Sequence, residues 1–192
     1  MKTRCALLLA MLVATSAHAQ RATAIFAGGC FWCMEPPYEK LKGVVSVTSG
    51  YTGGATKNPT YEDVSNGGTG HYEAVLITYD PRQVSYATLL DIFWRNVDPL
   101  DPNGQFCDKG DQYRAAIFYR NEAERQLAEQ TRRNLAQRKR WKIVTEILPA
   151  ATFYPAEKYH QDYYKKNPVR YKFYRFNCGR DHRLRQLWGK PK

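Results

Sequence analysis

Runs of apolar and β-branched residues, bounded by glycine, proline and asparagine, recur along the chain and predict short β-strands. The four runs span residues 23–27, 44–48, 72–79 and 143–148. The third run alternates along its length, which is typical of a strand whose two faces meet different surroundings. No internal repeat or low-complexity tract interrupts this pattern.

Two longer segments have helical patterns, each preceded by a residue that can cap a first turn. Ser85 precedes a segment whose apolar residues have helical spacing, namely Leu89, Leu90, Phe93 and Val97. Residues 121–124 match a capping box, and the helix that follows is expected to run to about Arg140. Strands that alternate with helices in this way predict an α/β or α+β sandwich of modest size.

The first twenty residues have the pattern of a secretory signal peptide. A basic start precedes an apolar core over residues 5–14, and a small-x-small cleavage signal ends at Ala19. We therefore expect residues 1–19 to be removed and residues 20–192 to form a single domain, in the periplasm or outside the cell. An uncleaved membrane anchor is the alternative, but the apolar core is too short to span a bilayer.

Composition and charge narrow the function classes. Hydrophobic residues make up 43% and charged residues 24% of the chain, which excludes an intrinsically disordered protein. The net charge is +11, and residues 155–192 hold eleven basic and three acidic residues, interleaved with aromatic rings. Such a segment can bind single-stranded nucleic acid. We favour a peripheral tail without nucleic acid, and leave binding to an anionic membrane surface or partner open.

The residues best suited to catalysis lie in the segment Gly28-Gly-Cys-Phe-Trp-Cys33. Prolines at 36–37 place the start of the next helix near residues 32–35, so Cys30 should lie at or just before its N-terminus. Free N–H groups and the helix dipole there favour a nucleophilic thiolate. Cys33 has the spacing to form a disulfide with Cys30 after oxidation. A structural disulfide or a zinc site is the alternative, but no second Cys-x-x-Cys is present to complete a zinc site.

Two aromatic residues and one acid are candidates to act together with the Cys30 thiol. Phe31 and Trp32 either form an apolar wall for a substrate methyl or thioether group, or anchor the turn in the core. In an alternating strand, Glu73 shares a face with Val75 and Ile77, so burial should raise its pKa and keep it protonated as a general acid. A solvent-exposed glutamate on an edge strand is the alternative.

Several short motifs follow one another in a fixed order along the chain. They are Gly29-Cys-Phe-Trp32, Gly50-Tyr-Thr-Gly-Gly54, Asn58-Pro-Thr-Tyr61, Thr69-Gly-His-Tyr-Glu-Ala74, Asp108 with Gln112-Tyr-Arg114, and Tyr159-His-Gln-Asp-Tyr163. This series resembles the A-type peptide methionine sulfoxide reductases over about residues 23–165. The resemblance implies a compact two-layer core with a ferredoxin-like mixed sheet, an irregular C-terminal tail, and no metal or organic cofactor. It also implies reduction of the S epimer of methionine sulfoxide, free or in proteins.

The same resemblance implies roles for individual residues. Cys30 would attack the sulfoxide sulfur, and Glu73 would give a proton to the sulfoxide oxygen. The other residues would form the pocket: Phe31 and Trp32 around the methyl group, Tyr61 and Tyr113 as hydrogen-bond donors, and Asp108 on the polar side. Cys30 would become a sulfenic acid, which a second cysteine converts to a disulfide. An external dithiol such as thioredoxin or a thioredoxin-like domain would reduce this disulfide in a monomeric enzyme.

The sequence leaves open which cysteine reacts with the sulfenic acid. Many members of the family have glycine where Cys33 stands and use cysteines in a C-terminal tail. We rank Cys33 first because it is adjacent in sequence, Cys178 in the tail second, and Cys107 beside Asp108 third. A relay, or a bridge between Cys107 and Cys178, also remains open.

Two other functions also remain open. A general thiol–disulfide oxidoreductase would use Cys30 and Cys33 without needing an acid. A basic binding module would use the C-terminal aromatic segment without needing either cysteine.

Overall fold

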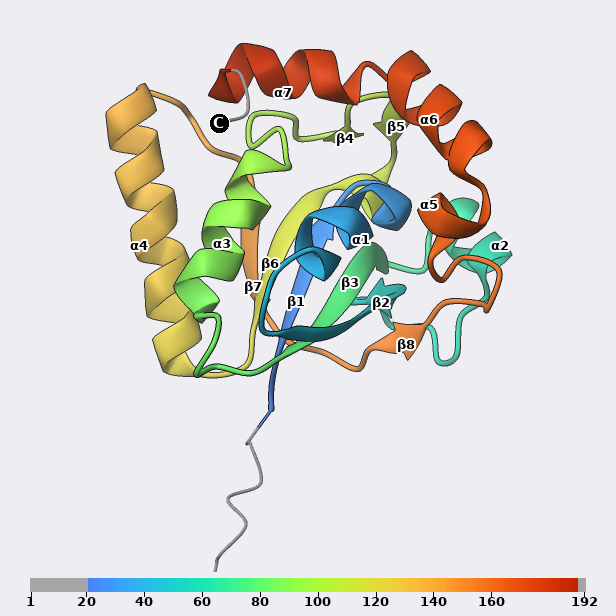
Figure 1. Cartoon of the computed structure of the whole chain (residues 1–192), viewed down its shortest axis with the longest axis horizontal. Coiled ribbons are helices and arrows are strands. Elements are labelled where there is room, and N and C mark those ends of the chain that lie inside the picture. Colours follow the sequence, from blue (N-terminus) through green and yellow to red (C-terminus); the bar gives the residue numbers. More distant parts are fainter. Residues whose placement is uncertain (1–20, 190–192) are drawn as a thin grey trace, which may run out of the picture.

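Six strands form the central sheet, and the computed structural model describes them within residues 21–189 (Figure 1). In sequence order they are β1 (Ala22–Gly28), β2 (Val44–Thr52), β3 (Tyr72–Tyr79), β6 (Ala115–Tyr119), β7 (Glu146–Pro149) and β8 (Tyr154–Pro155). Their order across the sheet is β7-β6-β1-β3-β2-β8, and every neighbouring pair is antiparallel except β6 and β7.

A ferredoxin-like unit makes up the middle of this sheet. The crossing helices are α1 (Phe31–Glu39) between β1 and β2, and α3 (Tyr86–Arg95) between β3 and β6. The resulting strand order β6-β1-β3-β2, antiparallel throughout, confirms the predicted α+β sandwich. Helix α4 (Glu122–Lys139) then carries the chain from β6 to the parallel strand β7, which needs such a crossover.

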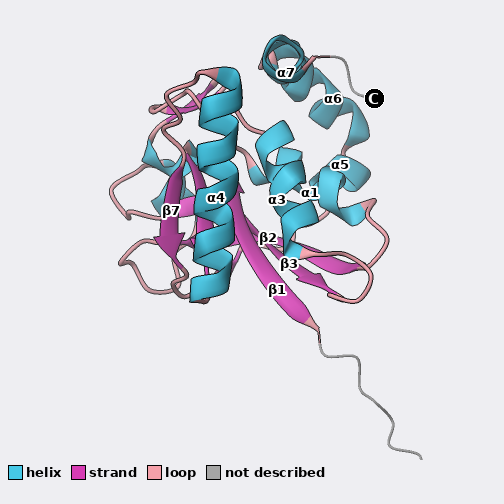
Figure 2. Ribbon diagram, turned by 90° about the vertical axis from the view of Figure 1, so that its left-hand side faces the viewer, coloured by secondary structure: helices cyan, strands magenta, loops and turns pink. Residues whose placement is uncertain are grey.

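The two faces of the sheet are covered by different parts of the chain (Figure 2). Helices α1, α3 and α4 pack on one face, where Phe26 and Ile77 join the main cluster of buried side chains. The opposite face has a smaller cluster around Ala74 and Phe118, covered by the segment that contains Leu148 and Phe153. Strand β3 therefore alternates between a helix-covered face and a loop-covered face, as its sequence predicts.

Most of the predicted elements lie where the pattern placed them, but the last predicted strand begins only at Glu146, and β6 and β8 of the central sheet were missed. Helix α3 begins after Ser85, whose side chain accepts the Thr88 N–H, and α4 begins after Asn121, whose side chain accepts the Glu124 N–H. Strand β6 was not predicted. Its first four residues are all buried, so the sequence lacks the alternation that marks a half-exposed strand.

The expectation of an irregular C-terminal tail is wrong, because the tail is helical. It contains α5 (Tyr163–Lys166), α6 (Pro168–Asn177) and α7 (Arg180–Trp188). Arg180 is almost fully buried and donates to the carbonyl oxygens of Gly28 (3.1 Å) and Asn96 (2.7 Å). The Arg183 guanidinium donates to Asp98 over 2.6 Å. Some basic residues of the tail therefore anchor α7 on the domain rather than face water.

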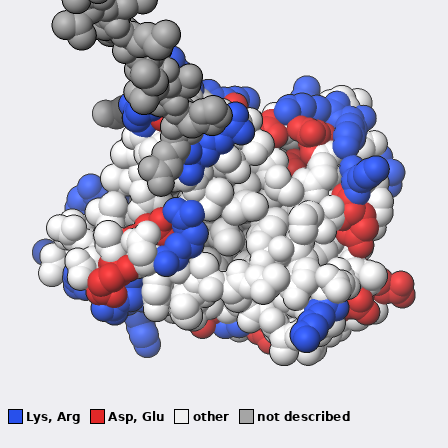
Figure 3. Space-filling model, turned by 90° about the horizontal axis from the view of Figure 1, so that it is seen from below, with Lys and Arg blue, Asp and Glu red and all other residues white. Residues whose placement is uncertain are grey.

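The predicted signal peptide over residues 1–19 lies outside the described residues. Within residues 21–189, no helix combines the length and apolar character needed to cross a membrane. From below, charged side chains of both signs lie mostly toward the edges of the face in view, and its middle is largely uncharged (Figure 3). The net positive charge is therefore not gathered into one patch on this face.

Candidate active site

Cys30 lies at the junction between the end of β1 and the start of α1. Gly29 has a φ of +77°, and a Cβ there would lie 2.6 Å from Cβ of Gln105, so only glycine fits this tight turn. Cys30 is the N-cap residue of α1, and its carbonyl oxygen accepts the Cys33 N–H over 3.0 Å. The helix therefore starts at Phe31, slightly before the predicted range, and Cys30 lies at its N-terminus as expected.

Glu73 lies directly beside this helix N-terminus, on the helix-covered face of β3. Its side chain is only 3% exposed, and its Oε2 atom accepts the Phe31 N–H over 3.1 Å. Burial raises the pKa of Glu73 to about 8, although the hydrogen bond from Phe31 opposes this shift. The group is therefore a buried neutral acid at pH 7, not an exposed edge-strand carboxylate.

The two thiols at the start of α1 have opposite pKa shifts. Burial, followed by a hydrogen bond with Cys33, raises the pKa of the Cys30 thiol well above its ordinary value. A hydrogen bond from Cys30, with Arg180 and Arg175 nearby, lowers the pKa of Cys33 to about 6. Burial thus opposes the Cys30 thiolate that the helix N-terminus favours. The two thiols share a hydrogen bond, and within this pair Cys33 is the more acidic thiol.

A cavity of about 70 Å³ opens beside Cys30, with space for a group of a few heavy atoms. Its lining residues come from α1, the start of α2 (Tyr61–Ser65), strand β3, strand β5 (Asp108–Lys109), the 3-10 helix η1 (Asp111–Tyr113), and α6. They are Cys30, Phe31, Trp32, Tyr61, Glu73, Asp108, Tyr113 and Tyr174. The fold thus brings seven of the predicted residues to one cavity and adds Tyr174.

The aromatic wall of this cavity is held by residues of the C-terminal segment. The Trp32 indole Nε1–H donates to His160 Nδ1 over 3.1 Å, and the Trp32 ring stacks on Tyr163 with a centroid distance of 3.7 Å. The Phe31 ring lies 5.0 Å from the His160 ring. Both aromatic residues therefore line the cavity and also anchor the turn.

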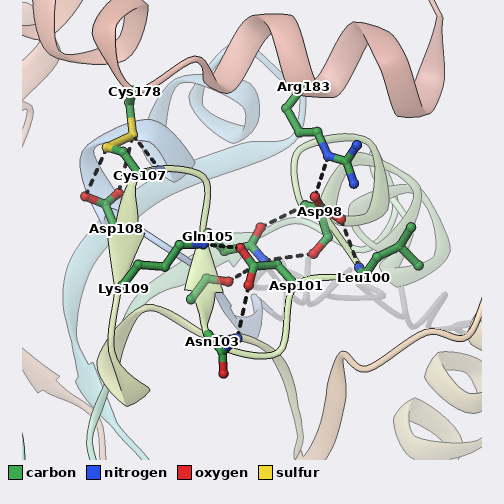
Figure 4. A network of polar contacts seen from close by, with 11 residues as sticks. Asp98, Leu100, Asp101, Asn103, Gln105, Cys107, Asp108, Lys109, Cys178 and Arg183 are labelled. Carbon is green, nitrogen blue, oxygen red and sulfur yellow. Dashed lines mark hydrogen bonds and ion pairs between the residues drawn. A yellow bond between two sulfur atoms is a disulfide. The ribbon is translucent and has the colours of Figure 1, made fainter.

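The other two cysteines form a disulfide behind the cavity wall (Figure 4). The Cys107 and Cys178 sulfurs are bonded at 2.00 Å, whereas Cys30 and Cys33 are free and buried. Of the arrangements that the sequence left open, the structure has the Cys107–Cys178 bridge. Among residues 21–189, the one cluster of metal-type ligands is Cys107, Asp108 and Cys178, and its two sulfurs are bonded to each other.

Comparison with known proteins identifies the family. The family model described as "Peptide methionine sulfoxide reductase" matches residues 22–192. The chain belongs to the peptide methionine sulfoxide reductase family. Its resemblance to this family, seen in the ordered motifs, is thereby confirmed, and the chain is a thiol-dependent oxidoreductase.

Individual members of the family are similar over most of their length. The chain is 56% identical to peptide methionine sulfoxide reductase MsrA of Halalkalibacterium halodurans, over 87% of this chain and 96% of that protein. It is 54% identical to peptide methionine sulfoxide reductase MsrA 2 of Caulobacter vibrioides, over 94% of each chain. The crystal structure of Mxr1 from Saccharomyces cerevisiae in reduced form superposes with a TM-score of 0.75. That structure is 32% identical, over 81% of this chain and 90% of the yeast chain.

Two residues at this cavity were not identified as site residues from the sequence. His160 is 2% exposed and touches three lining rings, and its motif Tyr159-His-Gln-Asp-Tyr163 was the signal that could have identified it. Tyr174 had no such signal, because it is one of many tyrosines in an aromatic tail. Only the packing of α6 beside the cavity shows that it belongs to the site.

Proposed function

We propose that this enzyme reduces the S epimer of methionine sulfoxide, free and in proteins, to methionine. The observation that carries the proposal is the placement of Cys30 and Glu73 on one small, partly aromatic cavity. A sulfoxide oxygen leaves sulfur only when it is protonated, so the reaction needs an acid that is neutral at working pH. Glu73, with its raised pKa of about 8, is such an acid.

The first step oxidises Cys30 and reduces the substrate sulfur. Cys30 attacks the sulfoxide sulfur, while Glu73 gives its proton to the oxygen and takes up the proton of the Cys30 thiol. The oxygen ends on Cys30 as a sulfenic acid, and the methionine sulfur keeps the electron pair of the broken sulfur–oxygen bond. Because burial raises the pKa of the Cys30 thiol, transfer of its proton to Glu73 assists the attack.

Residues that line the cavity support recognition of a single epimer, because different ones face the methyl group and the oxygen. Phe31 and Trp32 offer an apolar wall to the methyl group, and Glu73 faces the oxygen together with the hydroxyls of Tyr61 and Tyr113. Burial raises the pKa of Tyr61 to about 12, so its hydroxyl keeps the proton that it donates. A pyramidal sulfur whose methyl group and oxygen are both fixed can present only one configuration to Cys30. The family resemblance indicates that this is the S configuration.

Cys33 is the cysteine that we propose reacts with the sulfenic acid. It lies one helical turn from Cys30, and the nearby Arg180 and Arg175 favour its thiolate. Attack on the Cys30 sulfur releases water and forms the Cys30–Cys33 disulfide. An external dithiol of the thioredoxin type then reduces this disulfide to two thiols and is itself oxidised to a disulfide. Cys178 and Cys107, ranked lower, are bonded to each other and offer no thiol in this state.

We further propose that the enzyme acts as a monomer on oxidised exported proteins. The signal-peptide pattern over residues 1–19 supports export. Mass measurement of the protein from the periplasmic fraction should give a chain that begins at Gln20. A full-length chain found only in the cytoplasm would contradict this location without affecting the proposed reaction.

The reaction is tested by single-turnover reduction of the separated S and R epimers of a blocked methionine sulfoxide, without external reductant. We expect the wild type to convert only the S epimer and to lose two free thiols per methionine formed. Cys30→Ser should form no methionine from either epimer. Failure of the reduced, folded wild type to convert either epimer would contradict the proposal and favour a general thiol–disulfide oxidoreductase.

A further inference from the structure

Tyr174 connects three parts of the cavity from the C-terminal helix α6. Its side chain lines the cavity together with Cys30. Its hydroxyl donates a hydrogen bond to Asp108 Oδ2 over 2.5 Å, and its ring meets the Trp32 ring edge-on at a centroid distance of 5.9 Å. Tyr174 therefore contacts both the polar wall and the aromatic wall of the cavity.

The Cys107–Cys178 disulfide joins the same two segments covalently (Figure 4). Cys107 directly precedes Asp108, and Cys178 follows Tyr174 by one helical turn, with its N–H donating to the Tyr174 carbonyl oxygen over 2.9 Å. The Asp108 carboxylate lies against both sulfurs, with oxygen–sulfur distances of 3.7 Å to Cys107 and 3.9 Å to Cys178. The disulfide and the Tyr174–Asp108 hydrogen bond thus close one small ring behind the cavity.

Helix α6 is attached along one side only: besides the Tyr174 contacts, its Arg175 guanidinium donates to Asp181 of α7 over 2.6 Å. None of its residues is buried, and Val169, Phe173 and Phe176 are 79%, 70% and 82% exposed. Helix α7 is anchored independently through Arg180 and Arg183. Opening the disulfide would therefore leave α7 in place and remove the covalent link between the Asp108 segment and α6, which carries Tyr174.

We propose that the Cys107–Cys178 disulfide is a clamp that positions Tyr174 and Asp108 for binding of the sulfoxide, and that it is not consumed in the catalytic cycle. This inference rests on the proposed function of the cavity. Tyr174 holds one Asp108 oxygen in a fixed direction and supports the Trp32 ring, so the clamp acts on both sides of the substrate. Its removal weakens substrate binding more than it slows the chemical step, because Cys30 and Glu73 are held by β1, α1 and β3.

The clamp is tested by single-turnover kinetics with the S epimer, without external reductant, in four proteins. These are the wild type, Tyr174→Phe, Cys107→Ser/Cys178→Ser, and the variant that combines all three substitutions. We expect Tyr174→Phe and the double serine variant each to raise the half-saturating substrate concentration roughly tenfold, the size of one hydrogen bond to a charged group. The maximal rate should change far less.

Non-additivity separates a clamp from a merely stabilising bridge. Because the disulfide acts through Tyr174, the combined variant should show the same tenfold increase, not the roughly hundredfold product of independent effects. Phe173→Leu, an exposed aromatic on the same helix, serves as the control and should behave as wild type.

Three outcomes would overturn the clamp. They are an unchanged half-saturating concentration in Tyr174→Phe or in the double serine variant, an effect confined to the maximal rate, or multiplicative effects. If the double serine variant does not fold, the single variant Cys178→Ser, which also lacks the bridge, is combined with Tyr174→Phe instead, and multiplicative effects of these two would equally reject the clamp. A wild type that converts no S epimer would refute the proposed function itself, so the two failures are distinguishable.

Discussion

The two cysteine pairs of this enzyme differ in spacing, burial and chemical state. Cys30 and Cys33 are three residues apart on one helical turn, and both are buried free thiols. Cys107 and Cys178 are 71 residues apart and bonded, and they join a surface loop to the C-terminal helices. A pair on one turn can open and close without moving the chain, whereas a distant pair mainly restricts the unfolded chain. Spacing and surroundings, rather than the residue type, separate redox chemistry from structural support.

Replacing Cys33 should have the largest effect and tests the contrast between the two cysteine pairs most directly. Cys33→Ser should form one methionine per enzyme and then stop, because the Cys30 sulfenic acid lacks its partner thiolate. Methionine formation with a thioredoxin-type dithiol should fall to background, and a sulfenic acid trap should label Cys30. The double variant Cys107→Ser/Cys178→Ser is the matched control and should keep cycling at saturating substrate. Full cycling in Cys33→Ser would show that Cys33 is not the essential resolving cysteine.

Replacing the acid beside the first pair should give the next largest effect. Glu73→Gln should slow the single-turnover rate by roughly 10²–10⁴-fold, the usual contribution of a positioned acid. In the wild type, this rate should fall as the pH rises through about 8, since only protonated Glu73 can donate. The glutamine variant should lose that decline.

A buried carboxyl outside the cavity controls for a general effect of buried acids. Glu35→Gln should keep both the wild-type rate and its decline above pH 8, because Glu35 does not line the cavity. A wild-type rate that stays constant from pH 7 to 9.5 would argue against Glu73 as the donor.

The free energy of unfolding should fall when the Cys107–Cys178 pair is replaced and should change much less when Cys33 is replaced. Loss of a disulfide that closes a 71-residue loop lowers the free energy of unfolding by about 4 kcal/mol in the chain-entropy model. Urea unfolding of Cys107→Ser/Cys178→Ser under non-reducing conditions should show this loss, and Cys33→Ser should show a much smaller one. Equal losses in the two variants would remove the distinction between a structural and a catalytic pair.

Much of the fold could be predicted because its elements have one buried face. Strand β3 and helices α3 and α4 alternate or repeat with the period of their structure. Strand β6 lacks this signal because both of its faces are buried. The helical C-terminal segment could not be predicted for a different reason. Arg180 is buried because it meets carbonyl groups of Gly28 and Asn96, which lie 152 and 84 residues away in the sequence.

The site shows the same division between local and distant contacts. Cys30 and Glu73 could be placed by local patterns: a helix N-terminus and a strand face. The state of Cys30 could not be predicted, because burial by distant segments raises its pKa against the helix dipole. Tyr174 could not be identified either, since its contact with Asp108 joins residues 66 apart.

The C-terminal segment is also attached near its start, where the Asp162 N–H donates to Glu35. This attachment depends on the protonation of Glu35, in contrast to the covalent clamp. Glu35 on α1 is fully buried, and its Oε1 atom accepts the Ser49 hydroxyl over 2.8 Å and the Asp162 N–H over 3.3 Å. Its Oε2 atom has no hydrogen-bond partner among the described residues. Burial raises the pKa of Glu35 from 4.5 to about 7, so folding favours the protonated form.

Glu35 should therefore make stability depend on pH, which is the smallest of these effects. Its contribution is complete below about pH 4.5 and is lost as the pH rises through about 7, because a raised folded-state pKa favours the proton-bound state. Between pH 5 and pH 8, the wild type should lose about 1–3 kcal/mol more unfolding free energy than Glu35→Gln. Urea unfolding at a series of pH values measures this difference, and the titration of Glu73 cancels because both proteins contain it. Parallel stability profiles would mean that Glu35 carries its charge in the folded enzyme at no cost, and that the two attachments of the C-terminal segment do not differ in pH dependence.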